Sequence, residues 1–429
     1  MRVLLPCLLF LLGSCKSYPQ RTDAAFGDFR RGHFDLALKE YEKPETTGSD
    51  FLQWSESGMV ALTAGDWKKA TECLGKATKV VEEREHKALV SPESAGETLL
   101  TWTLNESFAA YEGEGYERVM LHATLAFAYL AQGLLEDARV ELRQADALLT
   151  TEEQLYSKDY KAGGLGHYLS AIGYELAGKP DEAYIDYKRM EQHGVGPELF
   201  APALARLAQE LHEDDDVELW RQRYHVEPEQ HAGKASIVVV AGVGLGPYKR
   251  ANTLPIPTGE GILQWSVPSY ETRPQPLPNV TLRLDNGGGA VESVVIEDVA
   301  RVSKENLDDR LAWLIAKSTV RAFLKRELTQ QLAKNDNSGL GWLIGTIFTV
   351  ATEQADLRAW QTLPNTWQAA RAFVEPGAHA IDLSAGSVSA KLGTYELQAG
   401  ETLFVFARTL DDQLHAYAIG GKAVPKGTP

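Results

Sequence analysis

The polar side chains with the most potential for chemistry lie in one stretch of the C-terminal half. They are Asp356, Arg358, Arg371 and His379, a set that would suit hydrolysis. No Ser/His/Asp order, HExxH motif or Cys/His pair accompanies them. An Asp and an Arg in one motif more often form a structural ion pair. We therefore predict no catalytic residue and expect that the protein is not an enzyme, with a hydrolytic site in this stretch as the alternative.

Metal, nucleotide and nucleic-acid chemistry are not indicated either. The ten histidines show no ligand spacing, so no metal site is predicted. The glycine-rich stretch 242–249 follows a β-branched run, but Pro247, Pro255 and Pro257 prevent the helix that a dinucleotide-binding fingerprint must open. We expect no cofactor. With 43 Lys and Arg against 59 Asp and Glu, the formal net charge is −16, and the chain lacks the basic clusters that nucleic-acid binding requires.

The first fifteen residues, MRVLLPCLLFLLGSC, indicate covalent lipid attachment. A basic residue and ten apolar residues form a segment that is too short to span a bilayer and is typical of a cleaved signal over residues 1–14. The run Leu12-Gly13-Ser14-Cys15 resembles the bacterial lipobox. The resemblance implies cleavage before Cys15, its triacylation, and an anchor segment over 15–20. Several acyl chains give stable membrane attachment. The alternative is a structured N-terminal element with a chance cysteine.

The residue after Cys15 bears on the destination of the protein. It is Lys16, whereas the sorting pattern that retains lipoproteins in the inner membrane has Asp there. The resemblance therefore implies an outer-membrane anchor that faces the periplasm. Cleavage would remove Cys7 and acylation would use Cys15, which leaves Cys73 without a disulfide partner.

The elements that position these residues begin with a helical repeat over 21–226. A glycine, an alanine five residues later and a bulky residue four further on recur in four copies. The copies are Gly32, Ala37 and Tyr41; Gly65, Ala70 and Leu74; Gly133, Ala138 and Leu142; Gly178, Ala183 and Tyr187. This spacing resembles the tetratricopeptide repeat (TPR), a 34-residue helix–turn–helix unit whose stacks typically bind a protein partner. A degenerate repeat or irregular insert is expected over 82–116, and an unrelated helical bundle is the alternative.

A linker over 227–234 and a second domain over 235–421 are expected to follow. The run Ser236 to Ala241 predicts a buried strand, and further strands are expected near 263–267, 280–284, 293–299, 381, 395 and 403–407. A helix over 307–334 and a second one over 340–351 would form a hairpin, with partner docking or interfacial insertion as the alternative for the second. Residues 422–429 are expected to be disordered. The predicted fold class is α + β multidomain: a TPR-like α-solenoid followed by a smaller α+β domain with a helical hairpin.

Two short segments stand out as a partner-binding or structural motif. In the first, Tyr111, Glu112, Gly113, Glu114 and Tyr116 precede a helix expected from Glu117. Acidic residues favour a helix N-terminus, so we expect a capped turn, with a contact site near the groove as the alternative.

The second segment holds Asp356, Arg358 and Trp360, shortly before Pro364. Residues two apart do not share a helix face, so Asp356 and Arg358 are expected to contact different neighbours unless the helix has already ended. We expect Arg358 to bond a carboxylate or backbone carbonyls at the junction of helix and sheet, with Trp360 packed in the core beside it.

Three stretches, 111–122, 244–250 and 352–381, carry a resemblance that spans most of the mature chain. It is to an uncharacterised family of bacterial lipoproteins with a TPR-like N-terminal half. The family's last stretch takes the form Ala-Asp, Arg, Trp, Thr-Leu-Pro, Ala-Arg and Pro-Gly. Here these are Ala355, Asp356, Arg358, Trp360, Thr362, Leu363, Pro364, Ala370, Arg371, Pro376 and Gly377. The resemblance implies a place in the cell envelope and brings no activity.

The expected function is that of a lipid-anchored, periplasm-facing scaffold or adaptor. Its partners would be the membrane, through acylated Cys15, and one or more periplasmic or envelope proteins in the TPR-like groove. No nucleic acid and no small-molecule cofactor are expected. Two alternatives stay open: an envelope hydrolase or cell-wall enzyme with its site in the C-terminal domain, and a structural lipoprotein of a secretion or surface assembly.

Overall fold

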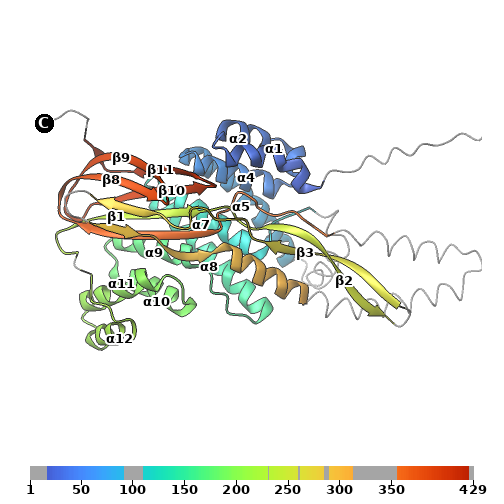
Figure 1. Ribbon diagram of the computed structural model, residues 1–429. Helices are drawn as coiled ribbons and strands as arrows, with labels where there is room; N and C mark the ends of the chain where they lie inside the picture. Colours follow the sequence, from blue (N-terminus) through green and yellow to red (C-terminus); the bar gives the residue numbers. More distant parts are fainter. Residues whose placement is uncertain are drawn as a thin grey trace, which may run out of the picture.

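A computed structural model describes residues 17–90, 110–229, 231–258, 261–284, 289–312 and 355–424, without the side chains of 84–90 and 253–265. Cys15, most of the expected helix 307–334, the segment 340–351 and residues 425–429 lie outside this part. The fold is mixed α/β, with an N-terminal helical region followed by sheets (Figure 1).

The four predicted repeat units each form two consecutive helices that pack against each other. The pairs are α1 (Tyr18–Arg30) and α2 (Phe34–Tyr41); α4 (Asp50–Thr63) and α5 (Trp67–Val90); α7 (Gly115–Leu130) and α8 (Leu135–Tyr156); α9 (Gly164–Leu176) and α10 (Pro180–His193). The short α3 (Pro44–Thr47) lies between the first two pairs, and α11 (Pro197–Glu210) and α12 (Asp214–Tyr224) form a fifth. Helix α5 occupies the start of the expected insert at 82–116, and α7 occupies its end.

The glycines and alanines of the repeat have the conformation and the burial that their spacing predicts. Gly32, Gly65, Gly133 and Gly178 all have φ between 66° and 78°, the left-handed conformation that ends a helix at low cost. The central alanines of the four copies are completely buried. At Gly58, a Cβ would lie 2.5 Å from Leu74 Cγ, so the first helix of this pair approaches the second more closely than any side chain would allow.

Two five-stranded sheets follow. The first has the order β11-β10-β1-β7-β6, with β1 parallel to β10 and the other neighbours antiparallel. Its strands are β1 (Ala235–Val243), β6 (Val294–Asp298), β7 (Thr366–Val374), β10 (Thr402–Leu410) and β11 (Gln413–Ile419). The second has the order β12-β9-β8-β4-β5, built from β4 (Thr281–Leu284), β5 (Ala290–Glu292), β8 (Gly377–Ala385), β9 (Val388–Leu397) and β12 (Lys422–Ala423).

A hairpin of β2 (Tyr248–Thr258) and β3 (Gly261–Glu271) reaches away from these sheets (Figure 1). A helix begins at residue 299 and is described as far as 312. It therefore starts eight residues, about two turns, before the predicted residue 307, directly after β6.

The first sheet is buried on both faces. Along β1, Val238 and Val240 belong to the same core cluster as the helices, whereas Ile237 and Val239 pack toward the second sheet. Successive side chains of a strand point to opposite faces, so the sheet forms the middle layer between helices and second sheet. Every residue of β1 is buried, as its run of β-branched residues predicts.

The sequence expectations for the C-terminal part need several corrections. Strands β2, β5, β7 and β11 were not expected. Lys422 and Ala423 were expected to be disordered but pair with β9, because the chain after Gly421 runs along that edge strand. In the described part of the chain, no helix is long and apolar enough to cross a membrane.

Candidate functional site

The two segments singled out in the sequence meet at one buried site between the helices and the first sheet. We call it the junction site and define it by Glu56, Tyr111, Glu114, Tyr116, Glu117, Lys249, Tyr270, Asp356, Arg358, Trp360, Gln361, Thr362 and Arg408. These residues come from α4, α7 and the turn before it, the β2–β3 hairpin, the loop 355–362 and β10. The stretches 111–122, 244–250 and 352–381 each contribute to it.

The expected capped turn at 111–118 is present. Glu114 is the N-cap of α7, and its backbone N–H donates to Glu117 Oε2 at 3.0 Å. The helix begins at Gly115, two residues before the predicted start. Gly113 has φ +85°, and a Cβ there would lie 2.6 Å from the ring of Phe51, which is why this turn requires glycine. Glu112 is half-buried beside it.

Glu114 is the electrostatic centre of the junction site. Its Oε1 lies 2.5 Å from Lys249 Nζ and accepts from Arg310 at 3.1 Å, and its Oε2 accepts from the Tyr270 hydroxyl at 2.9 Å. Glu114 and Lys249 are each only 5% exposed. A buried carboxylate is tolerated when opposite charge and hydrogen bonds surround it, as here.

Glu117 binds the loop that leads into the first sheet. Its Oε1 accepts the backbone N–H of Trp360 at 2.7 Å, and its Oε2 accepts the Tyr111 hydroxyl at 2.6 Å. The Tyr116 hydroxyl lies 3.3 Å from Oε1 and 2.8 Å from the hydroxyl of Tyr270. Burial, reinforced by the charge of Glu114, raises the pKa of Glu117.

Glu56 of α4 holds the next two residues of the same loop. It accepts the backbone N–H of Gln361 at 2.7 Å and that of Thr362 at 3.0 Å, and the Tyr18 hydroxyl at 2.7 Å. Its side chain is completely buried, and burial raises its pKa to about 7. The backbone N–H groups of three consecutive residues, 360–362, thus donate to the carboxylates of two helix residues, Glu117 and Glu56.

Two cations bind the carbonyl groups of this loop. Lys249 Nζ donates to the carbonyl oxygen of Arg358 at 2.8 Å, and Arg408 donates to that of Thr362 at 3.1 Å. Arg408 is completely buried and also donates to the carbonyls of Gly242 and Gly244. The backbone of 358–362 is therefore held from both sides, which satisfies polar groups that burial would otherwise leave unpaired.

Asp356 and Arg358 do not contact different neighbours, because the segment 355–360 is not helical. Arg358 Nε lies 2.9 Å from Asp356 Oδ1, and its Nη2 lies 2.7 Å from Oδ2, a two-pronged ion pair. Its guanidinium lies 5.0 Å from the centre of the Tyr111 ring. Trp360 is 1% exposed and packs edge-on against Phe51, so its expected place in the core is confirmed.

The other two polar candidates have separate partners. Arg371 forms two hydrogen bonds with Glu175 of α9, at 2.9 and 3.0 Å. His379 on β8 is half-buried, and its Nε2 lies 2.7 Å from the carbonyl oxygen of Glu375. Nothing in the described contacts assembles Asp356, Arg358, Arg371 and His379 into one set.

The contacts of the junction site hold the loop 358–362 against the helices and leave no free carboxylate oxygen on Glu114 or Glu117. All four carboxylate oxygens of Glu114 and Glu117 already have donors, and every residue that they bind except the half-buried Arg310 is buried. Sequence reasoning missed Glu56, Tyr270 and Arg408. Glu56 could have been singled out because it is a charged residue within the apolar run 51–63. Lys249 lies within the stretch 244–250 that carried the family resemblance.

A separate groove lies where the α7–α8 pair meets α9 and α10. Its space is about 510 Å³, including the solvent at its mouth. Val119, Met120 and Leu149 form apolar walls, and the polar side chains of His167, Asp186 and Arg189 lie beside them. Gly166 also lines it, and a Cβ on this residue would meet no atom within 4 Å.

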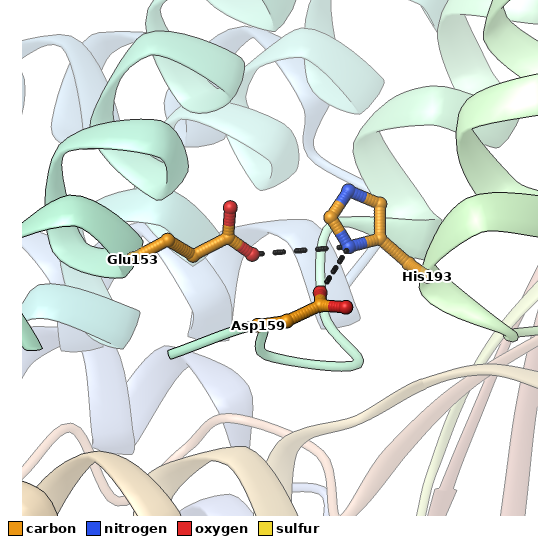
Figure 2. Close-up of side chains that lie close together, drawn as sticks. All are labelled: Glu153, Asp159 and His193. Carbon is orange, nitrogen blue, oxygen red and sulfur yellow. Dashed lines mark ion pairs between the residues drawn. The ribbon is translucent and has the colours of Figure 1, made fainter. Parts of the chain in front are cut away.

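One group of side chains among the described residues could hold a metal ion. Glu153, Asp159 and His193 place their ligand atoms within 4.8 Å of one another (Figure 2). These residues come from α8, the loop after it and the end of α10. Their spacing in the sequence gives no ligand motif, so sequence reasoning predicted no metal here.

Comparisons with known proteins place few constraints on this chain. No protein-family model matches it, and no curated protein matches it. Among solved structures, the chain is similar to one described as the crystal structure of MamA protein. The match has a TM-score of 0.32 and 15% sequence identity, and covers 48% of this chain and 89% of the other.

Proposed function

We propose that this protein is a lipid-anchored scaffold of the bacterial envelope, with a TPR-like helical array that binds a protein partner. The observation that carries the proposal is the groove between the α7–α8 and α9–α10 pairs. Its apolar walls and charged rim suit a peptide segment that buries small apolar side chains and pairs its own charges at the edge.

The helix pairs support the TPR-like part of this proposal. Four successive pairs have a left-handed glycine between their helices and completely buried alanines at equivalent positions. Stacked pairs of this kind present extended surfaces for partners. The lipobox-like run ending at Cys15 supports the anchor, and Lys16 supports an outer-membrane location that faces the periplasm.

A scaffold is favoured over an enzyme by the contacts of the polar candidates. Asp356 and Arg358 neutralise each other, and Glu114 and Glu117 are occupied by donors. A hydrolase that used Asp356 as an acid or base would lose activity in Asp356→Asn while keeping its partner. We expect the opposite result: Asp356→Asn weakens the fold and creates no selective loss of a catalytic rate.

The groove can be blocked with a well-matched pair of variants. Gly166→Phe places a ring in the groove, at a helical position where a Cβ has open space. The matched control is Gly75→Phe on α5, which adds the same ring at a helical position that also has open space but does not line the groove. The full chain carrying each variant is used for pull-downs from detergent-solubilised envelope, with crosslinking and mass spectrometry to identify partners. Partners enriched by the wild type and by Gly75→Phe should be lost with Gly166→Phe. If no partner separates the two variants, the groove is not the binding surface.

A further inference from the structure

Two helices, α8 and α10, and the loop that follows α8 bring two carboxylates and an imidazole together at the surface (Figure 2). His193 is the last residue of α10, and Glu153 lies in the last turn of α8. Asp159 belongs to the loop that follows α8. His193 Nδ1 lies 3.8 Å from Glu153 Oε1 and 3.6 Å from Asp159 Oδ1.

We propose that Glu153, Asp159 and His193 form a binding site for one divalent transition-metal ion, with Zn²⁺ as the best-matched ion. Tetrahedral Zn²⁺ bound at about 2.0–2.1 Å to N and O ligands holds these atoms about 3.4 Å apart. The two separations from His193 Nδ1 exceed this value by only a few tenths of an ångström, and all three ligand atoms lie within 4.8 Å of one another. Asp159, with a side chain 79% exposed on a loop, can supply the small movement that closes the site.

Charge at the site favours a cation. Among the described residues, no lysine or arginine forms an ion pair with Glu153 or Asp159; the nearby Lys158 pairs with Asp309 instead. The buried Oε1 of Glu153 has no hydrogen-bond partner in this part of the chain. The carbonyl ends of α8 and α10 also lie here, and the partial negative charge of a helix C-terminus stabilises a cation.

The donor set selects the class of ion. Imidazole nitrogen suits Zn²⁺ and its neighbours in the first transition row, whereas Mg²⁺ and Ca²⁺ prefer oxygen ligands alone. Three protein ligands leave a fourth position, which the carbonyl oxygen of Tyr160, 3.1 Å from His193 Nδ1, or a water molecule can fill. In the structure Nδ1 donates to this carbonyl oxygen. Metal binding therefore requires the proton to move to Nε2, which breaks that hydrogen bond and leaves the lone pair of Nδ1 facing the ion.

The ring of His193 is already oriented for this role. It stacks on the ring of His167 with centroids 5.7 Å apart and an interplanar angle of 12°. His167 lines the groove described above, so the ion would fix α8 to α10 beside that groove. The metal site is independent of the proposed scaffold function, because a groove can bind a partner with or without the ion.

The test uses the full chain after treatment with a chelator, titrated with ZnCl₂ alone in a calorimeter. We expect one saturable site with a Kd in the micromolar range. His193→Gln, Glu153→Gln and Asp159→Asn should each weaken Zn²⁺ binding about tenfold or more. Asp159→Asn changes only an exposed loop residue, so it keeps the test valid if the other two variants fail to fold. His379→Ala changes a half-buried histidine on β8 outside this cluster and should leave the Kd unchanged. Excess Mg²⁺ should not displace the ion.

Two results would overturn the proposal. One is the absence of saturable Zn²⁺ binding by the wild-type chain. The other is Zn²⁺ binding that keeps its affinity in Asp159→Asn and in whichever of the other two variants folds. Pull-downs with Gly166→Phe, carried out in chelator, report on the groove separately, so failure of the metal site and failure of the scaffold function are distinguishable.

Discussion

The buried carboxyl of Glu56 makes the stability of this fold depend on pH in a direction that can be tested. Its pKa is about 7 in the folded protein, against an ordinary 4.5, because burial disfavours the charged form. The folded state therefore binds a proton more readily than the unfolded chain. The stabilisation is fully present below about pH 4.5 and is lost as the pH rises through about 7.

The size of the effect follows from the two pKa values. At about 1.4 kcal/mol for each pH unit between them, protonation of Glu56 is linked to about 3 kcal/mol of folding free energy. Of this, about 2–3 kcal/mol falls between pH 5 and pH 8. The side chain is completely buried, so solvent screening does not reduce the value. Glu297 on β6, whose pKa burial also raises to about 7, adds a similar dependence of its own.

Glu56→Gln isolates the contribution of this residue. The amide oxygen of the new side chain can still accept from the Tyr18 hydroxyl or the Gln361 N–H. Its NH₂ group, however, faces the backbone N–H of Thr362, which is also a donor. Urea unfolding of the full chain is followed by tryptophan fluorescence at pH 5, 6, 7 and 8. The free energy of unfolding of the wild type minus that of Glu56→Gln should rise by about 2–3 kcal/mol from pH 8 to pH 5.

The control is Glu136→Gln, since the Glu136 side chain is 83% exposed and should change nothing across this range. A difference between wild type and Glu56→Gln that stays flat from pH 5 to pH 8 refutes the reasoning. It would mean that Glu56 is ionised throughout and that its three donors outweigh burial.

Four further predictions concern the junction site and the anchor. Lys249→Met should lower the free energy of unfolding by about 3–5 kcal/mol because it leaves Glu114 buried without its closest cation, and urea unfolding of the double variant with Glu114→Gln should recover part of the loss. Arg358→Ala should cost about 1–3 kcal/mol through unpaired acceptors, measured by thermal unfolding; unchanged stability with lost cellular function would instead make it a functional residue. Gly113→Ala should lower the melting temperature more than Gly133→Ala, because both glycines have left-handed φ but only the former would press a Cβ onto Phe51. Cys15→Ser, exported with a substituted cleavable signal, should leave the protein soluble on membrane fractionation, and a variant that still pellets would reveal a second anchor.

The helical region follows from sequence because its determinants are local. Left-handed glycines and buried alanines recur at fixed spacing, so one chain segment contains all the information for one helix pair. The same holds for the turn before α7, where Gly113 and the Glu114–Glu117 cap lie within five residues.

Strand β7 and the junction site are set by partners that are distant in the chain. Most of β7 is buried between the helices and the second sheet, so it lacks the alternation of polar and apolar residues by which a half-exposed strand is recognised. Glu56 meets Gln361, and Glu117 meets Trp360, only after the sheet has been packed against the helices. The carboxylate partner expected for Arg358 is present, but its identity, Asp356, did not follow from the sequence, because the two side chains can meet only where the segment 355–360 is not helical.

The junction site also bears on how the groove would work. The change from helices to strands falls between Tyr224 and Ala235, yet one buried cluster contains residues of both, from Leu62 in α4 to Phe406 in β10. Helix α7 contributes Glu117 to the junction site and Val119 to the groove, and α9 meets β6 closely: a Cβ on Gly164 would overlap the carbonyl oxygen of Ile296. Two of the helices that line the groove are thus fixed: α7 by a buried hydrogen bond to the loop that leads into the sheet, and α9 by close packing on β6. A partner that binds there meets a preorganised surface, and little of the binding free energy is lost to ordering the groove.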